Sequence, residues 1–234
     1  MTVQGRILHF HIAGINNQNF IMRDEETGSW WQQVSGEAIF GPLKGEHLRS
    51  VNNDELTFGL WKQENPEGRV LRPDEAVVRA GNYAPVDWEE RMTRVPVTTS
   101  QKLDTSLGPR TLVVGLEVNG ASVAYPFGAL LKQSLILDAV GRLPIFVVLG
   151  DDQKSVRAFE RSIDGRTLEF FVKQGASPFR LVDGETGSEW DFAGKAIAGS
   201  LAGKQLKKIP VLNDYWFDWQ TYHPDTGIYQ LGNR

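Results

Sequence analysis

The chain contains the same sequence pattern twice, and this repeat constrains its fold more than any other feature. The first copy reads Asp-x-Glu-Thr-Gly-Ser-x-Trp over residues 24–31 and Gly-x-Ala-Ile-x-Gly-x-Leu-x-Gly over residues 36–45. The second copy has both patterns at residues 183–190 and 194–203. The spacing is 159 residues for the first pattern and 158 for the second, so only one residue is deleted between them. Because self-similarity at a fixed spacing indicates a copied structural unit, we predict two related units from an internal duplication.

The repeat sets the predicted limits of the two units. Further matches 158 residues apart, Trp61 with Trp219 and Pro66 with Pro224, carry it toward the end of each copy. Residues 71–109 have no counterpart and contain four prolines, which is typical of a linker. The second copy also extends further upstream, so the first unit is expected to be shortened at its N-terminal side. We predict a first β unit over residues 1–72, a linker packed on the surface over 73–109, and a second, fuller β unit over 110–234.

Strand and turn patterns indicate a mainly β chain. Asn119 and Gly120 separate two alternating apolar runs, which predicts a hairpin with a type I′ turn. The apolar runs 135–137 and 145–149 are typical of buried strands, and Pro126 is suited to the first turn of a short helix. We expect a mainly β fold in which the two β-rich units pack as one pseudo-symmetric body with few short helices.

Composition narrows the functional classes. The 29 acidic and 25 basic residues give a formal charge of −4, which argues against a nucleic-acid partner because such proteins present a basic face. No apolar run reaches the roughly 18 residues of a transmembrane helix, and the N-terminus does not resemble a signal peptide. The absence of cysteine excludes disulfides, thiolate zinc sites and cysteine nucleophiles. The compartment and any cofactor stay open.

The repeated patterns, with Ala-Tyr-Pro at residues 124–126 and His-Pro-Asp-Thr at 223–226, resemble the bacterial and archaeal domain-of-unknown-function family 3179. The resemblance covers nearly the whole chain except the linker, and it implies no particular activity. The resemblance does imply a cysteine-bearing stretch on the strand that follows the position of Asp138. It also implies that a His-Glu pair often lies just before the position of Asp138. The corresponding segments here, Val148–Asp152 and Gln133–Ile136, contain neither Cys nor His. Any chemistry done by those residues in relatives is expected to be lost in this chain.

The repeated turn gives the first set of candidate site residues. Its carboxylates and threonine hydroxyl can face a cation or a sugar, although Ca²⁺ requires six to eight oxygens. Alternatively, the same residue types stabilise the turn itself, because Asp and Thr bond local backbone and Gly adopts positive φ. The repeated tryptophans Trp31 and Trp190, like Trp61 and Trp219, are expected to anchor the core. The two extra tryptophans are expected to be partly exposed. The candidate ligand-binding residues are Asp24, Glu26, Thr27, Trp30, Asp183, Glu185, Thr186 and Trp216.

The histidines give the second set. His9 and His11 lie two apart on an expected strand over residues 6–12, so both face one side and can ligate a metal. Alternatively they are surface residues on a strand whose Leu8, Phe10 and Ile12 face inward. His223 with Asp225 is the candidate acid/base pair, because His titrates near neutral pH. The alternative for His223 is a capping role in its turn.

No catalytic or nucleotide-binding sequence motif is present: the chain lacks a nucleophile elbow, a Walker loop, a dinucleotide fingerprint and a zincin helix. Two functions are carried forward from the sequence. The first is a non-catalytic binding or scaffold module, favoured by the missing cysteines and the missing catalytic motifs. The alternative is a hydrolase-like or metal-assisted enzyme that uses the loop carboxylates and His223.

Overall fold

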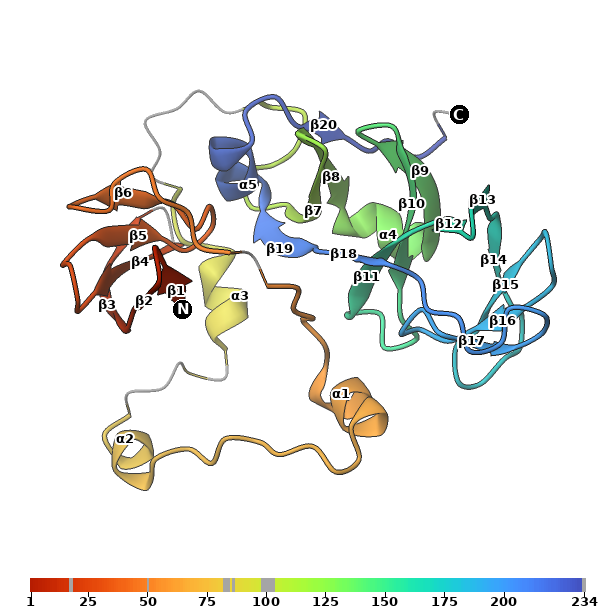
Figure 1. Cartoon of the computed structure of the whole chain (residues 1–234), viewed down its shortest axis with the longest axis horizontal. Helices are drawn as coiled ribbons and strands as arrows, with labels where there is room; N and C mark the ends of the chain where they lie inside the picture. The colour runs from red at the N-terminus through yellow and green to blue at the C-terminus, as the bar shows by residue number, and fades with distance from the viewer. Residues whose placement is uncertain (17–18, 50, 82–84, 86, 98–103, 233–234) are drawn as a thin grey trace.

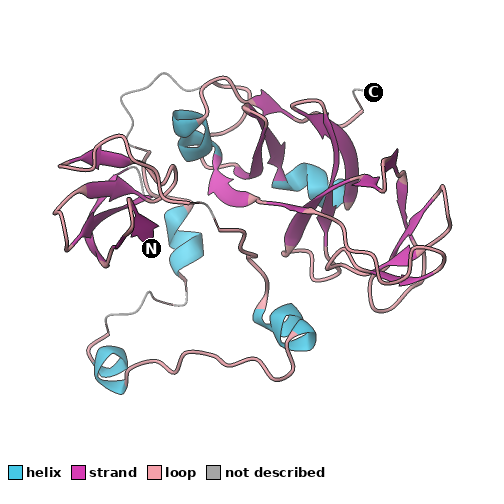
Figure 2. Cartoon of the chain, viewed as in Figure 1, coloured by secondary structure: helices cyan, strands magenta, loops and turns pink. Residues whose placement is uncertain are grey.

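A computed structural model describes residues 1–16, 19–49, 51–81, 85, 87–97 and 104–232. The described chain is mainly β, as predicted, with several small antiparallel sheets and five short helices (Figures 1 and 2). No helix in these ranges has the length and the apolar character needed to cross a membrane.

The N-terminal sheet has four antiparallel strands in the order β3-β4-β5-β6. Trp31 is fully buried beneath it, as the repeat predicts, and Leu8 packs in the same cluster. The strand expected over residues 6–12 is divided: it breaks at Leu8 and His9, and Ile12 is 64% exposed instead of facing inward. The strands of this region are β1 Thr2–Val3, β2 Arg6–Ile7, β3 Phe10–Asn16, β4 Asn19–Asp24, β5 Trp30–Gln32 and β6 Ala38–Phe40.

Two central sheets of four strands each enclose the largest core cluster, with strand orders β19-β7-β8-β20 and β18-β11-β10-β9 (Figure 1). The predicted hairpin is present, since β7 pairs with β8 and both turn residues, Asn119 and Gly120, have positive φ. The elements are β7 Leu112–Val118, β8 Ala121–Pro126, α4 Phe127–Lys132, β9 Leu135–Val140, β10 Leu143–Leu149, β11 Val156–Glu160, β18 Lys208–Ile209, β19 Leu212–Tyr215 and β20 Gly227–Ile228.

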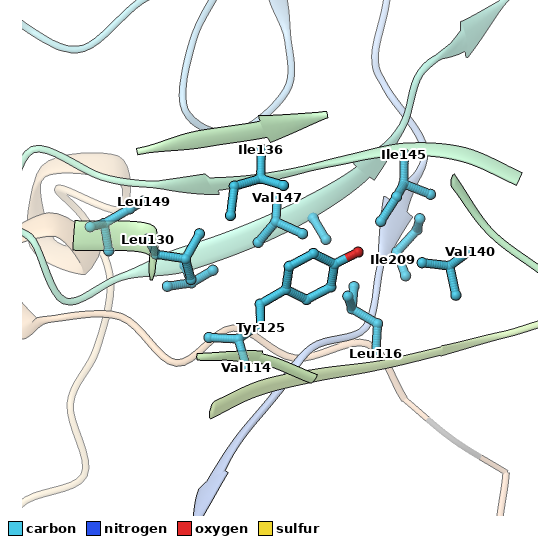
Figure 3. Packing of buried hydrophobic residues seen from close by; sticks show 12 residues of the cluster. Val114, Leu116, Tyr125, Leu130, Ile136, Val140, Ile145, Val147, Leu149 and Ile209 are labelled. Carbon is cyan, nitrogen blue, oxygen red and sulfur yellow. The ribbon is translucent and has the colours of Figure 1, made fainter. Parts of the chain in front are cut away.

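Tyr125 of the Ala-Tyr-Pro pattern stands in the middle of this central core (Figure 3). Its ring is fully buried, and its hydroxyl donates a hydrogen bond of 2.7 Å to Asp138 Oδ2. Burial, with the nearby Asp138 carboxylate, raises the pKa of Tyr125 far above its ordinary value. The Tyr125 side chain is therefore neutral and has a structural role, because it donates a hydrogen bond to the Asp138 carboxylate at the edge of the core.

The C-terminal sheet, β14-β15-β16-β17, has the same strand order as the N-terminal sheet and buries Trp190 where the other buries Trp31. The turn at Asp164 and Gly165 closes a hairpin whose paired strands are only two residues long. The elements are β12 Ser162–Ile163, β13 Arg166–Thr167, β14 Phe170–Val172, β15 Leu181–Asp183, β16 Glu189–Trp190 and β17 Ala196–Ala198.

A short helix follows each of these two sheets and packs against the other half of the chain. Helix α1, Phe58–Glu64, follows the N-terminal sheet, yet Leu56 and Leu60 pack on the core of the C-terminal sheet. Helix α5, Trp216–Tyr222, follows the C-terminal sheet and lies toward the N-terminal sheet (Figure 1), where Asp218 accepts a hydrogen bond from Asn19. The two halves are thus connected crosswise.

The segment between the halves carries α2, Glu75–Arg79, and α3, Trp88–Met92. The stretch that leads from α1 to α2 runs away from the sheets (Figure 1), and Leu71 is 94% exposed. The surface packing of the linker over residues 73–109 stays a prediction. The unit boundaries at residues 72 and 109 and the common origin of the two halves stay predictions.

Candidate functional site

The Asp-x-Glu-Thr-Gly-Ser-x-Trp turns are closed by the same hydrogen bonds in both copies. Asp24 accepts from the Thr27 N–H at 2.5 Å and from Trp31 Nε1 at 2.8 Å. Asp183 accepts from the Thr186 N–H at 2.6 Å and from Trp190 Nε1 at 2.9 Å. Both aspartates are fully buried. Burial by itself raises the pKa of Asp24, but the donors from Trp31, Thr27 and Ser29 outweigh it and hold that pKa below its ordinary value.

The threonine and serine of each turn extend this network to the next loop. The Thr27 and Ser29 hydroxyls lie 2.7 Å apart, and the Leu43 N–H donates to Ser29 Oγ; Thr186, Ser188 and Leu201 repeat these contacts. Gly41 and Gly199 pass so close to the serine that an added Cβ would lie 2.7 and 2.6 Å from its Cα. These hydrogen bonds account for the repeated residue types of the turn, with Asp24, Thr27, Asp183 and Thr186 turned inward. Ligand binding by the turn residues stays a prediction.

The remaining turn carboxylates accept hydrogen bonds from the backbone of the residue just before β3 and of the residue just before β14. Glu26 Oε2 accepts from the His9 N–H and Glu185 Oε2 from the Glu169 N–H, both at 2.9 Å. His9 Nδ1 lies 2.7 Å from Glu26 Oε1, while His11 is exposed on β3. Hydrogen bonds from His9 lower the pKa of Glu26. In the described ranges, no group of three His, Asp or Glu side chains is placed to hold a metal ion, and His9 and His11 as ligands stay a prediction.

The tryptophans separate into exposed and buried classes differently from the expectation. Trp30 is 41% exposed and packs edge-to-face on Phe40, so it remains available for stacking. Trp216 was expected to be partly exposed, but it is 1% exposed because α5 turns it into a core cluster, where its Nε1 donates to the Asp104 carbonyl. Trp61 was expected in the core, yet it is only half-buried at the surface of α1 and stacks on Phe58.

His223 ends helix α5, and its contacts are those of a helix cap. Its N–H and its ring Nδ1 both lie against the Trp219 carbonyl, the ring nitrogen at 3.2 Å, and the ring stacks on the Trp219 indole at 3.7 Å. Its Nε2 lies 3.3 Å from Glu117 Oε2, and no bond joins it to Asp225 within the described chain. Asn65, 158 residues earlier, makes the same contacts through its N–H and Nδ2 with the Trp61 carbonyl. The acid/base role of His223 and Asp225 stays a prediction.

This equivalence gives a first test. We expect His223→Asn to cost about 1 kcal/mol less in the free energy of unfolding than His223→Ala, because the amide can donate to the Trp219 carbonyl as Asn65 does at Trp61. Both variants lose the ring stacked on Trp219, so the difference between them reports on the donor alone. Urea unfolding of both variants measures this. Equal losses for the two would contradict the capping role.

A cleft of about 710 Å³ lies between α1 and the C-terminal half. Its apolar lining includes Leu60, Phe179 and Phe192, and its rim carries Asp151 and Asp191. The segment Val148–Asp152, which the resemblance singles out, thus reaches this cleft through its last residues. Sequence reasoning assigned no ligand to this place, because its two walls are far apart in the chain.

A buried arginine fixes the helix that roofs the cleft. Arg157 is 3% exposed, and its guanidinium bonds Glu64 through both terminal nitrogens at 2.7 Å and Asp54 at 2.8 Å. The guanidinium carbon also lies 4.9 Å from the centre of the Phe192 ring. Thr57 adds a 2.7 Å hydrogen bond to Asp152. Although burial favours the protonated form of Asp152, the donors from Ser155 and Thr57 lower its pKa, so it is ionised at neutral pH.

A second polar cluster, also missed from the sequence, lies where α5 meets the N-terminal sheet. Asp214 is the last residue but one of β19, and Asp218 and Tyr222 lie one turn apart on α5. Asp218 is 3% exposed and accepts a 2.5 Å hydrogen bond from Asn19. The available signal was the repeat itself, because Asp214 and Asp218 align with Leu56 and Leu60 at a spacing of 158.

Comparison with known proteins supplies a family but no function. No curated protein and no solved structure matches the chain. A family model described as "Protein of unknown function (DUF3179)" matches residues 1–226, which is nearly the whole chain and includes both copies of the repeated turn. The chain therefore belongs to this family of proteins of unknown function, DUF3179.

Proposed function

We propose that the protein is a non-catalytic binding module, and that its ligand occupies the cleft beneath α1. The observation that carries this proposal is the combination of an apolar floor with an acidic rim. Leu60, Phe179 and Phe192 offer an aromatic and aliphatic surface, which is typical of small-molecule sites. The acid/base candidates His223 and Asp225 and the metal candidates His9 and His11 are not among the residues that line this cleft.

The charges of the cleft select the ligand class. Asp151 makes no hydrogen bond or ion pair in the described chain, and it lines the cleft, as does Asp191. Glu64 is neutralised by Arg157, and Arg180 is the one basic residue among those that line the cleft. The free carboxylate charge therefore exceeds the basic charge. A ligand with an apolar or aromatic group and a primary amine or guanidinium fits this surface, for example a small aromatic amine or a peptide end that bears Lys or Arg.

The test uses benzylamine, phenethylamine and the dipeptide amide Phe-Lys, each with its neutral acetylated form, in which both amines of Phe-Lys are acetylated. Binding is followed by amide chemical-shift changes of the full chain. We expect the cationic probes to shift amide resonances of residues that line the cleft. Asp151→Asn should weaken the affinity of these probes about two- to fivefold, because an exposed charge pair contributes up to about 1 kcal/mol. Asp225→Asn, an equally exposed acid outside the cleft, should leave binding unchanged. Absence of cleft shifts for every probe, or equal losses for Asp151→Asn and Asp225→Asn, would overturn the proposal.

A further inference from the structure

The two crosswise helices meet their opposite halves through chemically different contacts. At the α1 contact, Leu56 and Leu60 pack on the core of the C-terminal sheet. At the α5 contact, the aligned positions hold Asp214 and Asp218. The residue that faces Asp218 is also polar, since Asn19 stands where the other half has Pro178, a residue of the apolar cleft. The helices end alike, because Asn65 and His223 have nearly the same backbone angles.

Each carboxyl group of the α5 contact has one oxygen that accepts a hydrogen bond, Asp214 Oδ1 from the Tyr215 N–H and Asp218 Oδ2 from Asn19, and one that does not. Asp214 Oδ2 and Asp218 Oδ1 are buried and accept no hydrogen bond from a donor among the described residues. None of the ion pairs in the described chain includes Asp214 or Asp218. Burying two adjacent carboxylates without a cation costs several kcal/mol, and such pairs keep a proton instead. A proton on one carboxyl group would let it donate to the other and would satisfy both orphan oxygens.

The groups around the pair strengthen this conclusion. Asp214 comes from β19 and Asp218 and Tyr222 from α5; Glu55 adds a negative charge from the segment before α1, while Asn19 and Gln32 come from β4 and β5. Burial raises the pKa of Asp214 to about 8, with the charge of Asp218 as the second cause. Burial also raises the pKa of Asp218, to about 6, although Asn19 opposes this. The pair therefore holds a proton near neutral pH.

We propose that Asp214 and Asp218 form a proton-binding site that holds the N-terminal sheet against α5, so that this contact between the two halves loosens as the pH rises. The closed contact binds a proton that the open one releases. Because both acids titrate above their ordinary values when closed, closure is fully favoured at low pH. It is lost as the pH rises through about 6 to 8. This proposal is independent of the ligand of the cleft.

The chain contains no cysteine, so two labels can be placed cleanly for a distance measurement. Lys44 of the N-terminal half and Lys154 of the C-terminal half are both exposed. Nitroxides on Lys44→Cys and Lys154→Cys should give one narrow distance distribution at pH 5.5, and a broader one with longer distances at pH 9. In the Asp214→Asn, Asp218→Asn background the amides stay neutral, and the distribution at pH 9 should match that at pH 5.5.

Matched controls complete the test. The double variant Asp164→Asn, Asp225→Asn removes two exposed acids elsewhere and should respond to pH as the parent does. The proposal is overturned if the parent distribution is the same at both pH values, or if the Asp214→Asn, Asp218→Asn variant broadens as the parent does. If that variant does not fold, amide exchange of the unlabelled parent decides. After correction for intrinsic exchange rates, the protection of the amides of residues 19–24 and 216–222 should fall between pH 6 and 8. Unchanged protection would overturn the proposal.

Discussion

Replacing Arg157 with methionine should lower the free energy of unfolding by about 3 kcal/mol, at the lower end of what breaking a buried ion pair costs. Methionine preserves much of the aliphatic volume, so the loss reports mainly on the guanidinium. Without it, Glu64 loses two charge-assisted hydrogen bonds and Asp54 loses one. Both carboxylates are largely covered, at 25% and 21% exposure, so water replaces only part of what is lost. Urea unfolding at neutral pH, with two-state behaviour checked by a second probe, measures the change.

The same substitution should release α1 before the rest of the chain unfolds. Arg157 is the main charged contact between α1 and the C-terminal half, and it also packs on Phe192 in the cleft wall. We expect amide exchange over residues 58–64 to accelerate at least tenfold while β10 stays protected. Arg157→Lys should not rescue the helix, because an ammonium cannot form the two-point contact with Glu64. As the matched control, Arg180→Met removes a basic residue of the same cleft that has no carboxylate partner in the described chain. A loss below 1 kcal/mol for Arg157→Met would show that solvation compensates.

The two crosswise contacts should respond to pH in opposite directions. Burial favours protonated Asp54, but the hydrogen bonds from Arg157 and Lys208 outweigh this and lower its pKa. The α1 contact is therefore stable above the ordinary pKa of aspartate and is lost as the pH falls through the lowered value. The acid pair of the α5 contact has raised pKa values and is weakened as the pH rises. Each bound proton contributes a slope of about 1.4 kcal/mol per pH unit, so the chain should be most compact at mildly acidic pH.

Local chemistry was predictable from the sequence because its causes are local. The Asn119-Gly120 hairpin and the buried Trp31 and Trp190 follow from turn preference and from a repeated large aromatic residue. The mainly β class followed in the same way. The turn around Asp24 and Asp183 was foreseen as one of two interpretations, and its hydrogen bonds now match residue by residue between the copies.

The packing of the short helices against distant parts of the chain was not predictable, because the sequence of a short helix does not indicate which sheet it will cover. Helices α1 and α5 are seven residues each, too short for a periodic signal, and each packs across the molecule. The exposure of Trp216 was misjudged for this reason, since α5 itself closes over it. The partners of Arg157 lie 93 and 103 residues away. The acid pair, however, was visible as a departure from the repeat at Leu56 and Leu60.

The matched substitutions Asp24→Ala and Asp183→Ala should each cost about 3 kcal/mol, although neither aspartate touches the cleft. Each is fully buried and accepts hydrogen bonds from a tryptophan Nε1, a threonine hydroxyl and a backbone N–H. Alanine leaves those donors buried without an acceptor, and an unsatisfied buried donor costs about 1–3 kcal/mol. Water can reach some of these donors where the turn opens, so the expected cost lies at the low end of the sum over the three donors.

Thr27→Val and Thr186→Val serve as milder controls at about 1 kcal/mol, because they remove one hydroxyl and retain the Nε1 contact. Unfolding followed by tryptophan fluorescence reports on both turns, since Trp31 and Trp190 are direct partners of the replaced groups. If the aspartates bound a ligand instead of closing the turn, the alanine variants would lose binding while keeping their stability. Equal losses in the two copies, within about 1 kcal/mol, would mean that each turn is held by its own hydrogen bonds alone. A much smaller loss at Asp24 would mean that the N-terminal sheet unfolds separately, before the C-terminal half, because only then would its turn stop contributing to the measured transition.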